Sequence, residues 1–515
     1  MRAYNFIHFG IRVVVVAVVA GLAAQAGCSE SSRESEPEPV EIEDAAVPPE
    51  VAAHERDWPL PNADYDNTRR APATNIDSHN VSQLHEVWRR PFECTALFGC
   101  VTSNPLLLGE TVYVQDMASN VFALARDSGE LRWVHRIDAL TPGPNGVAVG
   151  WGKVFANRGD TGIVALDSSN GEELWRFEPT LVKSEGIDVQ PTVYGGSVFV
   201  STVPASLRGI YLGGSRGIIQ ALAADSGEVR WQFDTIDSED AWGDAETNGG
   251  GGAWYPPLID ASRGLTFWGT GNPLPWPGTP EQPSGASRPG PNLYTSSLVA
   301  LGLEDGALAW FHQEREHDLF DGDFQNPPIH ARTQDGESVI GSGKTGTVVS
   351  LAIEDGTLQW RAKVGQHQND DLRELPEEPL EILPGALGGV LTPPAYADGV
   401  VYVPIVDLAT SFSGTEWLLD PKQATGALTA LDARDGSELW TVQLPAPAYG
   451  AATVANDLVL TSDYAGRVYA FARDSGEELW HYDAGGGINA PLAIAGDLVL
   501  IPVGLDNPAL IALSL

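Results

Sequence analysis

The chain has 515 residues, of which 43% are hydrophobic, and a formal net charge of −39. The apolar content is ample for a folded core. So negative a charge argues against a function in which this chain binds nucleic acid or an anionic membrane through a basic patch. The charge itself is interpreted as an aid to solubility in a salty extracellular setting, or alternatively as a field that steers a cationic partner.

The first 28 residues indicate an export signal. The apolar run 13–26 is too short for a comfortable membrane span. It ends in Ala26-Gly27-Cys28, and small residues before a Cys resemble the signal of a bacterial lipoprotein, in which Cys28 becomes the lipidated first residue. Gln25 replaces the usual aliphatic residue, so an ordinary cleaved signal is the alternative. Either way we expect export, to the periplasm, to the outer membrane or out of the cell, with membrane contact only through a lipid on Cys28.

A tether is expected next, and the folded domain is expected at 57–515. Residues 29–56 are rich in Glu, Ser and Pro with little to bury, which is typical of a disordered acidic linker. Within the domain, Cys94 and Cys100 are close in sequence, and in an oxidising compartment they most simply form a disulfide. A metal site is not expected there, because no His or further Cys lies at ligand spacing.

One short phrase recurs along the domain: an Asp or Asn, a Gly within two residues, and a Trp four residues after the Gly. The copy Asp127-Ser-Gly-Glu-Leu-Arg-Trp133 follows the strand-like run 121–124. The Asp-x-Gly element supplies a turn with positive φ, and the next strand carries the Trp. The seven copies end at Trp133, Trp175, Trp231, Trp310, Trp360, Trp440 and Trp480.

These Trp residues lie 40 to 80 residues apart, and the shortest spacings match one four-stranded propeller blade. Trp88 has no such turn before it, so we expect it on a strand that closes a ring against the C-terminal strands near Leu515. The predicted fold class is all-β: an eight-bladed β-propeller in which the Trp residues dock between neighbouring blades.

Three intervals between the repeats are longer than one blade needs, namely 175–231, 231–310 and 360–440. In repeat folds such insertions usually lie on one face, which is often the binding face. The chemistry is therefore expected in these insertions.

Several segments resemble the pyrroloquinoline quinone (PQQ)-dependent alcohol dehydrogenases, a quinoprotein family. The resemblance extends over 58–515 and is most specific in the middle of the chain. It is carried by an opening segment at 58–69 and 81–88, a cofactor-floor and metal-ligand region at 249–254 and 269–276, and a catalytic-Asp stretch at 292–301 and 317–323.

Carried over residue by residue, the resemblance implies a cofactor site with PQQ and a calcium or lanthanide ion. Trp254 matches the aromatic slab beneath the planar quinone, with Gly252 beside it in the glycine run. Asn272 matches a side-chain ligand of the metal. Asp321 matches the general base at the metal, and Lys344 matches the cation that contacts the quinone oxygens. In such a site a hard cation polarises the quinone, a carboxylate takes the alcohol proton and hydride passes to the cofactor.

The chain also departs from the family. Residues 211–217, where the family has a Glu metal ligand, hold no carboxylate. Residues 142–145 replace the adjacent-cysteine disulfide that covers the quinone, and the Arg expected before Gly146 is absent. The family's Asn-Trp pair is replaced within 388–392. The chain thus retains matches to the family's aromatic floor, general base and cationic lysine. It lacks the disulfide that covers the quinone and one metal ligand.

Asp323 is a hypothetical replacement for that ligand, since an Asp at its position resembles the lanthanide-using branch of the family. His312 and His317 flank the site, but two histidines without a third ligand are weak evidence for a metal. The alternatives are structural: Asp321 as a turn residue and Lys344 as a partner of surface acids.

Two functions from different classes follow. The first is an exported quinoprotein dehydrogenase that oxidises a small-molecule alcohol, a sugar or a hydroxyl polymer. The chain has no Cys-x-x-Cys-His motif, so no haem is expected, and electrons would pass to an external cytochrome or another acceptor. The second is a non-catalytic propeller lipoprotein, similar to the outer-membrane assembly factor that binds protein partners. The lipoprotein-like start favours the scaffold, whereas the insertions and the set of site residues favour the enzyme. A quinoprotein that kept the fold and lost the cofactor is the intermediate case.

Overall fold

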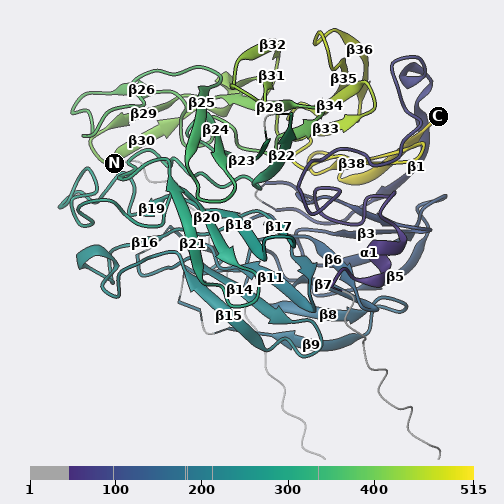
Figure 1. Cartoon of the computed structure of the whole chain (residues 1–515), viewed down its shortest axis with the longest axis horizontal. Helices are drawn as coiled ribbons and strands as arrows, with labels where there is room; N and C mark the ends of the chain where they lie inside the picture. Colours follow the sequence, from purple (N-terminus) through teal and green to yellow (C-terminus); the bar gives the residue numbers. More distant parts are fainter. Residues whose placement is uncertain (1–45, 97, 180, 183, 212, 335) are drawn as a thin grey trace, which may run out of the picture. The chain divides into compact units, whose positions relative to one another are not determined.

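The computed structural model describes residues 46–96, 98–179, 181–182, 184–211, 213–334 and 336–515. They belong to one compact unit, Asp44–Leu515, which Figure 1 shows with its strands labelled. The export signal expected at 1–28 and the first part of the tether lie outside the described residues.

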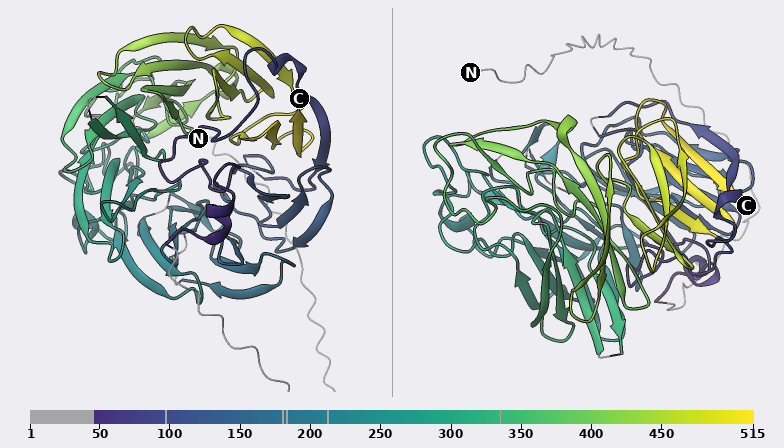
Figure 2. Two further views of the ribbon diagram at one scale, coloured as in Figure 1. Left: turned by 45° about the vertical axis from the view of Figure 1, so that its right-hand side comes forward. Right: turned by 90° about the horizontal axis from the view of Figure 1, so that it is seen from above.

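The described chain is built on eight four-stranded antiparallel sheets, which follow one another around a ring in Figure 2. The first four sheets are β2 (Leu106–Leu108), β3 (Thr111–Gln115), β4 (Val121–Ala125) and β5 (Leu131–His135); β6 (Val147–Gly150), β7 (Lys153–Asn157), β8 (Ile163–Asp167) and β9 (Glu173–Phe177); β10 (Thr192–Tyr194), β11 (Ser197–Ser201), β14 (Ile218–Ala223) and β15 (Val229–Asp234); and β17 (Leu258–Asp260), β18 (Leu265–Gly269), β20 (Ser297–Gly302) and β21 (Leu308–Gln313).

The next three sheets repeat the pattern. They are β22 (Ile329–Thr333), β23 (Gly336–Ser342), β24 (Thr347–Ala352) and β25 (Leu358–Lys363); β27 (Ala395–Ala397), β28 (Val400–Asp407), β31 (Thr425–Asp432) and β32 (Glu438–Leu444); and β33 (Ala452–Ala455), β34 (Leu458–Ser462), β35 (Arg467–Ala472) and β36 (Glu478–Asp483).

The eighth sheet joins the two ends of the domain. Three strands come from the C-terminus, β37 (Ala493–Ala495), β38 (Leu498–Val503) and β39 (Ala509–Ser514), and the fourth is β1 (His85–Pro91). β1 runs antiparallel to β39, with Trp88 opposite Ala512. The prediction that the strand of Trp88 closes the ring is therefore confirmed.

The recurrent Trp residues pack between successive sheets. The indole N–H of Trp310 donates to the backbone carbonyl of Ile353 at 3.1 Å, in the turn of the following sheet. A Cβ at Gly356 of that turn would lie 2.5 Å from the Trp310 ring, so the glycine provides both the positive φ of 73° and the room for the indole. The same contact recurs at seven of these Trp residues: Trp88, Trp133, Trp175, Trp231, Trp310, Trp360 and Trp440.

The longer intervals contribute three small sheets outside this pattern. They are β12 (Ala205–Ser206) with β13 (Gly209–Ile210), β16 (Gly249–Gly250) with β19 (Pro273–Leu274), and β26 (Leu380–Ile382) with β29 (Thr410–Ser413) and β30 (Glu416–Leu419). Short 3-10 turns lie at η1 (Val81–Gln83), η2 (Ala241–Gly243) and η3 (Pro421–Gln423).

The N-terminal part of the domain corrects one expectation. Helix α1 (Pro49–Ala53) lies within the segment 29–56 that was expected to be disordered. It buries Val51, and the Glu50 carboxylate accepts a hydrogen bond from the backbone N–H of Trp151 at 2.9 Å. For 46–56 the expectation of disorder is therefore wrong, because a few apolar and acidic contacts anchor the segment to the second sheet.

Cys94 and Cys100 form a disulfide with their Cα atoms 5.4 Å apart, as predicted. Among the described residues, no helix has the length and apolar character needed to cross a membrane.

Candidate functional site

A buried lysine joins two of the predicted acidic residues. The Lys344 ammonium lies 2.9 Å from Oδ2 of Asp321 and 2.7 Å from Oδ2 of Asp323, and the three side chains are 7%, 3% and 4% exposed. Lys344 lies in the turn between β23 and β24, whereas the two acids lie in the loop between β21 and β22. Lys344 therefore pairs with buried acids rather than with surface acids.

The loop that carries the acids is fixed on both sides of Asp321. The buried Asp318 carboxylate accepts hydrogen bonds from the backbone N–H groups of Phe320 and Gly322, at 3.2 and 2.9 Å. Asp321 has a φ of 64°, a conformation that Asp tolerates better than most residues. These contacts hold the Asp321 side chain in one place against Lys344.

Asn272 and Trp254 reach the same place from the preceding insertion. The Asn272 backbone N–H donates to Oδ1 of Asp323 at 2.6 Å. A Cβ at Gly271 would lie 2.9 Å from that Oδ1 and 3.2 Å from Nε1 of Trp254. The absence of a side chain at Gly271 is therefore what lets the indole and the carboxylate approach each other.

The opposite edge of the Trp254 indole is also bordered by a glycine. A Cβ at Gly143 would lie 3.0 Å from Cζ3 of Trp254 and 2.8 Å from Cβ of Asp188. Gly143 belongs to the segment 142–145 that replaces the family's cysteine lid. The half-buried indole is thus bordered by two glycines, and a side chain at either position would displace it.

Burial and mutual attraction set the charges of the site. Burial raises the pKa of the Asp321 carboxyl well above its usual value; the Lys344 ammonium opposes this rise and the charge of Asp323 adds to it. For Lys344, burial lowers the pKa, but the attraction of Asp321 and Asp323 outweighs burial and raises it well above the usual value. The lysine is therefore firmly cationic and offsets only one of two carboxylates.

Buried carboxylate oxygens of Asp188, Asp318 and Asp321 have no hydrogen-bond partner among the described residues. Oδ1 of Asp321 is buried, and no described residue donates a hydrogen bond to it. An unpaired buried carboxylate oxygen is costly, so such an atom calls for a ligand, a cation or a proton. The arrangement can accept the proton of a hydroxyl group while Lys344 holds the other oxygen of the same carboxylate.

The fit to a metal ion is partial. Asn272, Asp321 and Asp323 offer hard oxygen donors of the kind that calcium and related ions prefer. Within the described residues, however, no group of three or more His, Cys, Asp and Glu side chains could hold a metal. Both oxygens of Asp323 are engaged, one by Asn272 and one by Lys344. A cation here would need further oxygens from a cofactor, with Asp321 Oδ1 as one of the protein donors.

Other predicted residues have structural contacts. The Gly252 carbonyl accepts the Gly271 N–H at 2.8 Å, and a Cβ at Gly252 would collide with Val203 and Pro204, so this glycine packs the insertion against the connection between β11 and β12. His312 pairs with Glu314, and His317 contacts backbone carbonyls. Neither histidine contacts the acidic pair in the structure.

Several residues around the site were not identified from the sequence. Burial raises the pKa of Tyr211, and the charges of Asp321 and Lys344 act on it. Burial likewise raises the pKa of Tyr255 to about 12, with Lys344 among the charges that act on it. Asp188 is fully buried beside Trp254, and burial raises the pKa of its carboxyl well above the usual value. These three residues come from segments far apart in the sequence, so their association with the site is visible only in the structure.

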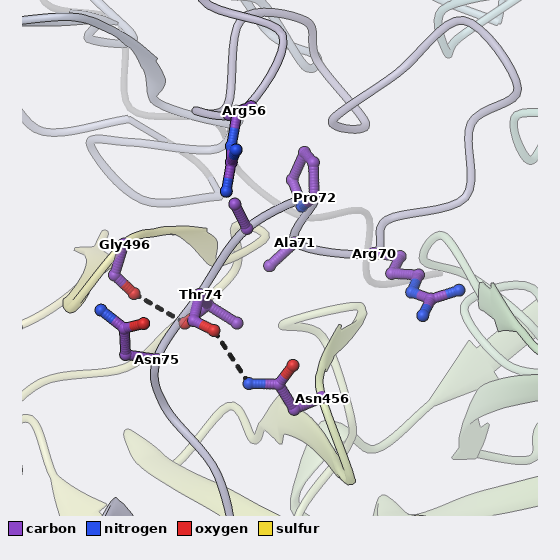
Figure 3. Close-up of a pocket in the computed structure, with 9 residues that line it drawn as sticks. Arg56, Arg70, Ala71, Pro72, Thr74, Asn75, Asn456 and Gly496 are labelled. Atoms are coloured by element: carbon purple, nitrogen blue, oxygen red, sulfur yellow. Dashed lines mark hydrogen bonds between the residues drawn. The ribbon is translucent and has the colours of Figure 1, made fainter.

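A hollow of about 400 Å³ lies elsewhere, where the segment 70–75 crosses the last two sheets (Figure 3). The Thr74 hydroxyl donates to the Gly496 carbonyl at 2.7 Å, and the Asn456 amide donates to the Thr74 carbonyl at 2.9 Å. The hollow includes none of the predicted site residues, and its contacts tie the opening segment to the closing sheets.

Comparisons with known proteins identify the family of this chain. The family model described as glucose/ethanol/alcohol dehydrogenase, beta-propeller domain, matches residues 58–149 and 185–362, more than half of the chain. The chain therefore belongs to this quinoprotein alcohol dehydrogenase-like family, as the resemblance implied. A second model, outer membrane protein assembly factor BamB, matches residues 344–504. That stretch includes Lys344 but none of its acidic partners, so the scaffold alternative is not favoured.

Individual relatives are similar over most of their length. The chain is 26% identical to a quinohemoprotein alcohol dehydrogenase of Comamonas testosteroni, over 85% of this chain and 71% of the relative. The crystal structure of that enzyme from the same organism superposes with a TM-score of 0.79 at 22% identity, over 90% of this chain and 81% of that one. A europium-containing methanol dehydrogenase gives a TM-score of 0.75 at 21% identity, over 90% and 99%. At these identities the structures show the fold, an all-β propeller-like arrangement.

Proposed function

We propose that this protein is an exported quinoprotein dehydrogenase that oxidises a hydroxyl-bearing substrate with PQQ and a bound metal ion, and passes the electrons to an external acceptor. The observation that carries this proposal is the unpaired Oδ1 of Asp321. It is a buried carboxylate oxygen beside a paired lysine, on the residue that the resemblance matches to the family's base. A purely structural ion pair would not need to leave this oxygen without a hydrogen bond.

The chain's own residues would divide the work. Trp254 supports a flat ring between Gly143 and Gly271, and Lys344 offers its ammonium to oxygens on that ring while it holds Oδ2 of Asp321. Oδ1 of Asp321 is left to receive the hydroxyl proton of the substrate. When bound, the quinone would accept the hydride from the carbinol carbon, with the cation polarising its carbonyl.

Asn272 and Asp321 would hold the cation, and Asp323 would join them once Lys344 turned from its Oδ2 toward the quinone oxygens. With no carboxylate at 211–217, Asp323 restores the number of acidic ligands to that of an ordinary calcium site. Calcium and a lanthanide both suit hard oxygen donors, and the similarity to a europium-containing enzyme supports testing both ions.

The setting of the enzyme belongs to the same proposal. The eight four-stranded sheets would be the eight blades of one propeller over 57–515. The segment 1–28 would direct export, with a lipid on Cys28, and an external cytochrome would take the electrons. A small-molecule alcohol, a sugar and a hydroxyl polymer are all compatible with a base of this kind.

Reconstitution tests the proposal. Purified protein incubated with PQQ and either calcium or lanthanum should reduce an artificial dye when an alcohol is added, and omission of PQQ should abolish the reduction. Absence of alcohol-dependent dye reduction with both ions and with a range of alcohols and aldoses would contradict the proposal.

A further inference from the structure

Arg288 is a fully buried cation to which the proposed reaction gives no part. It lies in the long loop between β19 and β20. Its four side-chain hydrogen bonds go to neutral acceptors. Burial lowers its pKa to about 10, and the charge of Asp318 opposes this fall, so the group stays cationic at neutral pH. A buried charge is costly unless hydrogen bonds compensate for the lost water, so the contacts of this guanidinium need an explanation.

The guanidinium joins the two loops that carry the candidate site. Nε and Nη2 of Arg288 donate to the Pro275 carbonyl at 3.2 and 3.1 Å. Nη2 also donates to the backbone carbonyl of Asp318 at 2.5 Å. Pro275 is three residues after Asn272, and Asp318 is three residues before Asp321. One side chain therefore connects the metal-ligand loop to the base loop.

Asn292 holds the guanidinium in this orientation. Nη1 of Arg288 donates to Oδ1 of Asn292 at 2.6 Å, and Nδ2 of Asn292 donates to the backbone carbonyl of Arg288 at 3.0 Å. The backbone N–H of Asn292 donates to the Glu316 carbonyl at 2.8 Å, just before the base loop. Because the fork of an arginine is planar and rigid, a fork oriented in this way fixes the positions of the carbonyls that it bridges.

The same two loops are also joined at their other ends. The Phe324 N–H donates to the Thr270 carbonyl at 3.0 Å, and the Asn272 N–H donates to Oδ1 of Asp323 at 2.6 Å. Along each loop, the predicted metal ligand and the predicted base lie between these contacts and the guanidinium. The separation of the two loops is therefore fixed on both sides of the site.

Aromatic contacts to the small sheet β26–β29–β30 hold the loops less directionally. The Trp276 ring lies 5.3 Å from that of Trp417, which is 46% exposed, and the Phe320 ring lies 5.1 Å from that of Phe412. Ring contacts tolerate small shifts, whereas hydrogen bonds weaken steeply when distance and angle change. The guanidinium is therefore the more precise of the two connections at this end of the loops.

We propose that Arg288 is a positioning residue, whose guanidinium sets the distance between the metal-ligand loop and the base loop so that Asn272 and Asp321 face the same bound ion. The consequence for the ion rests on the proposed function, whereas the positioning of the loops does not. Arg288→Lys keeps the charge, but a single ammonium on a flexible stem cannot reproduce the fork. Loss of residues that orient metal ligands typically costs about 10–100-fold in metal affinity.

Hydrogen exchange of the metal-free protein tests the positioning. The Asn272 amide joins the two loops, and in Arg288→Lys it should exchange about tenfold faster, because the loops can separate. Arg69→Lys is the matched control: Arg69 is also fully buried, and its five hydrogen bonds to neutral acceptors join the opening segment to other sheets. It should lower the midpoint of thermal unfolding comparably and leave exchange at Asn272 unchanged. Unchanged exchange in Arg288→Lys, or equal acceleration in both variants, would overturn the inference.

Asn292→Ala provides a milder test should Arg288→Lys fail to fold. It removes only the partner of Nη1 and keeps the contacts of the guanidinium with both loops, so exchange at Asn272 should still be faster than in the wild type. Exchange at the wild-type rate in folded Asn292→Ala would overturn the inference.

Retention of lanthanum in the presence of PQQ, measured by equilibrium dialysis, separates this inference from the proposed function. Arg288→Lys is expected to bind lanthanum about 10–100-fold more weakly than the wild type, and Arg69→Lys as tightly as the wild type. Equal retention by Arg288→Lys and the wild type would overturn the role of Arg288 at the ion. A wild type that retains no lanthanum and no calcium contradicts the proposed function, and exchange at Asn272 still decides whether Arg288 positions the loops.

Discussion

Oδ2 of Asp321 lies 2.9 Å from the Lys344 ammonium, while Oδ1 of the same carboxylate has no hydrogen-bond partner among the described residues. Lys344 thus holds the Asp321 carboxylate through one oxygen and leaves the other oxygen able to accept a proton. The Asp321 side chain is held in position from one side and is free to react on the other.

Asp321→Asn should abolish alcohol-dependent dye reduction and leave the fold intact. An amide cannot accept the hydroxyl proton, and the loss of a general base typically costs about 10²–10⁴-fold in rate. The fold should persist because Lys344 keeps Asp323 as its partner at 2.7 Å. The measurement is kcat of the reconstituted variant beside its thermal unfolding. Asp371→Asn, a change of an exposed acid in the third long insertion, is the control. Undiminished turnover of Asp321→Asn would remove this residue from the mechanism.

The titration of metal-free protein should reflect the raised pKa of Asp321. Burial raises the pKa of this carboxyl, so without a cation it should titrate at a higher pH than an ordinary carboxyl. The charge of Asp323 adds to this rise, so Asp323→Asn should move the titration of Asp321 to lower pH. Titration of the carboxyl groups in both metal-free proteins, followed by NMR, checks the direction. A titration of Asp321 that moves to higher pH in the variant would contradict the assignment.

Asp323 should also determine which ion the protein retains. Removing one carboxylate lowers the negative charge of the site. This weakens the binding of a trivalent ion more than the binding of a divalent one. Asp323→Ala is therefore expected to lose retention of lanthanum at least about tenfold more than retention of calcium. Equilibrium dialysis with PQQ present measures both ions. An equal loss for both would show that Asp323 does not select the ion.

The period of the fold was readable from sequence because its signals are local. Each glycine and its Trp are four residues apart, and one turn determines how the strand that carries the Trp begins. Trp88 has no such turn before it, and its strand was predicted from the Trp residue alone. The helix at Pro49–Ala53 was missed because its anchor is a contact between Glu50 and Trp151, about a hundred residues away.

The site was predictable only as far as the family resemblance extended. Asp321, Asn272 and Lys344 were identified by matching positions, but the contacts that link them, directly or through Asp323, join three separate loops and leave no local pattern. The contact of Lys344 with Asp323, 21 residues apart, is one example. Trp417 lies in an insertion that matched no motif, so its place beside Trp276 came only from the structure.

Trp310 should contribute strongly to stability. Its indole is 8% exposed and packs on Gly356 of the next sheet, so Trp310→Ala would leave a large cavity between sheets. We expect a loss of about 3–5 kcal/mol in the free energy of unfolding, seen as a lower midpoint in thermal denaturation. Trp417→Ala, at an indole that is 46% exposed, should change the midpoint far less. Equal destabilisation by both changes would contradict the packing role of Trp310.

The central claim is that Trp254, Asn272, Asp321 and Lys344 form a cofactor site, and titration with PQQ tests it most directly. Metal-free protein is mixed with PQQ and either calcium or lanthanum, passed through a sizing column and examined for quinone absorbance. The account predicts stoichiometric absorbance that elutes with the wild type and is lost in Trp254→Ala. Elution of all quinone apart from the wild-type protein, with both ions, would contradict it.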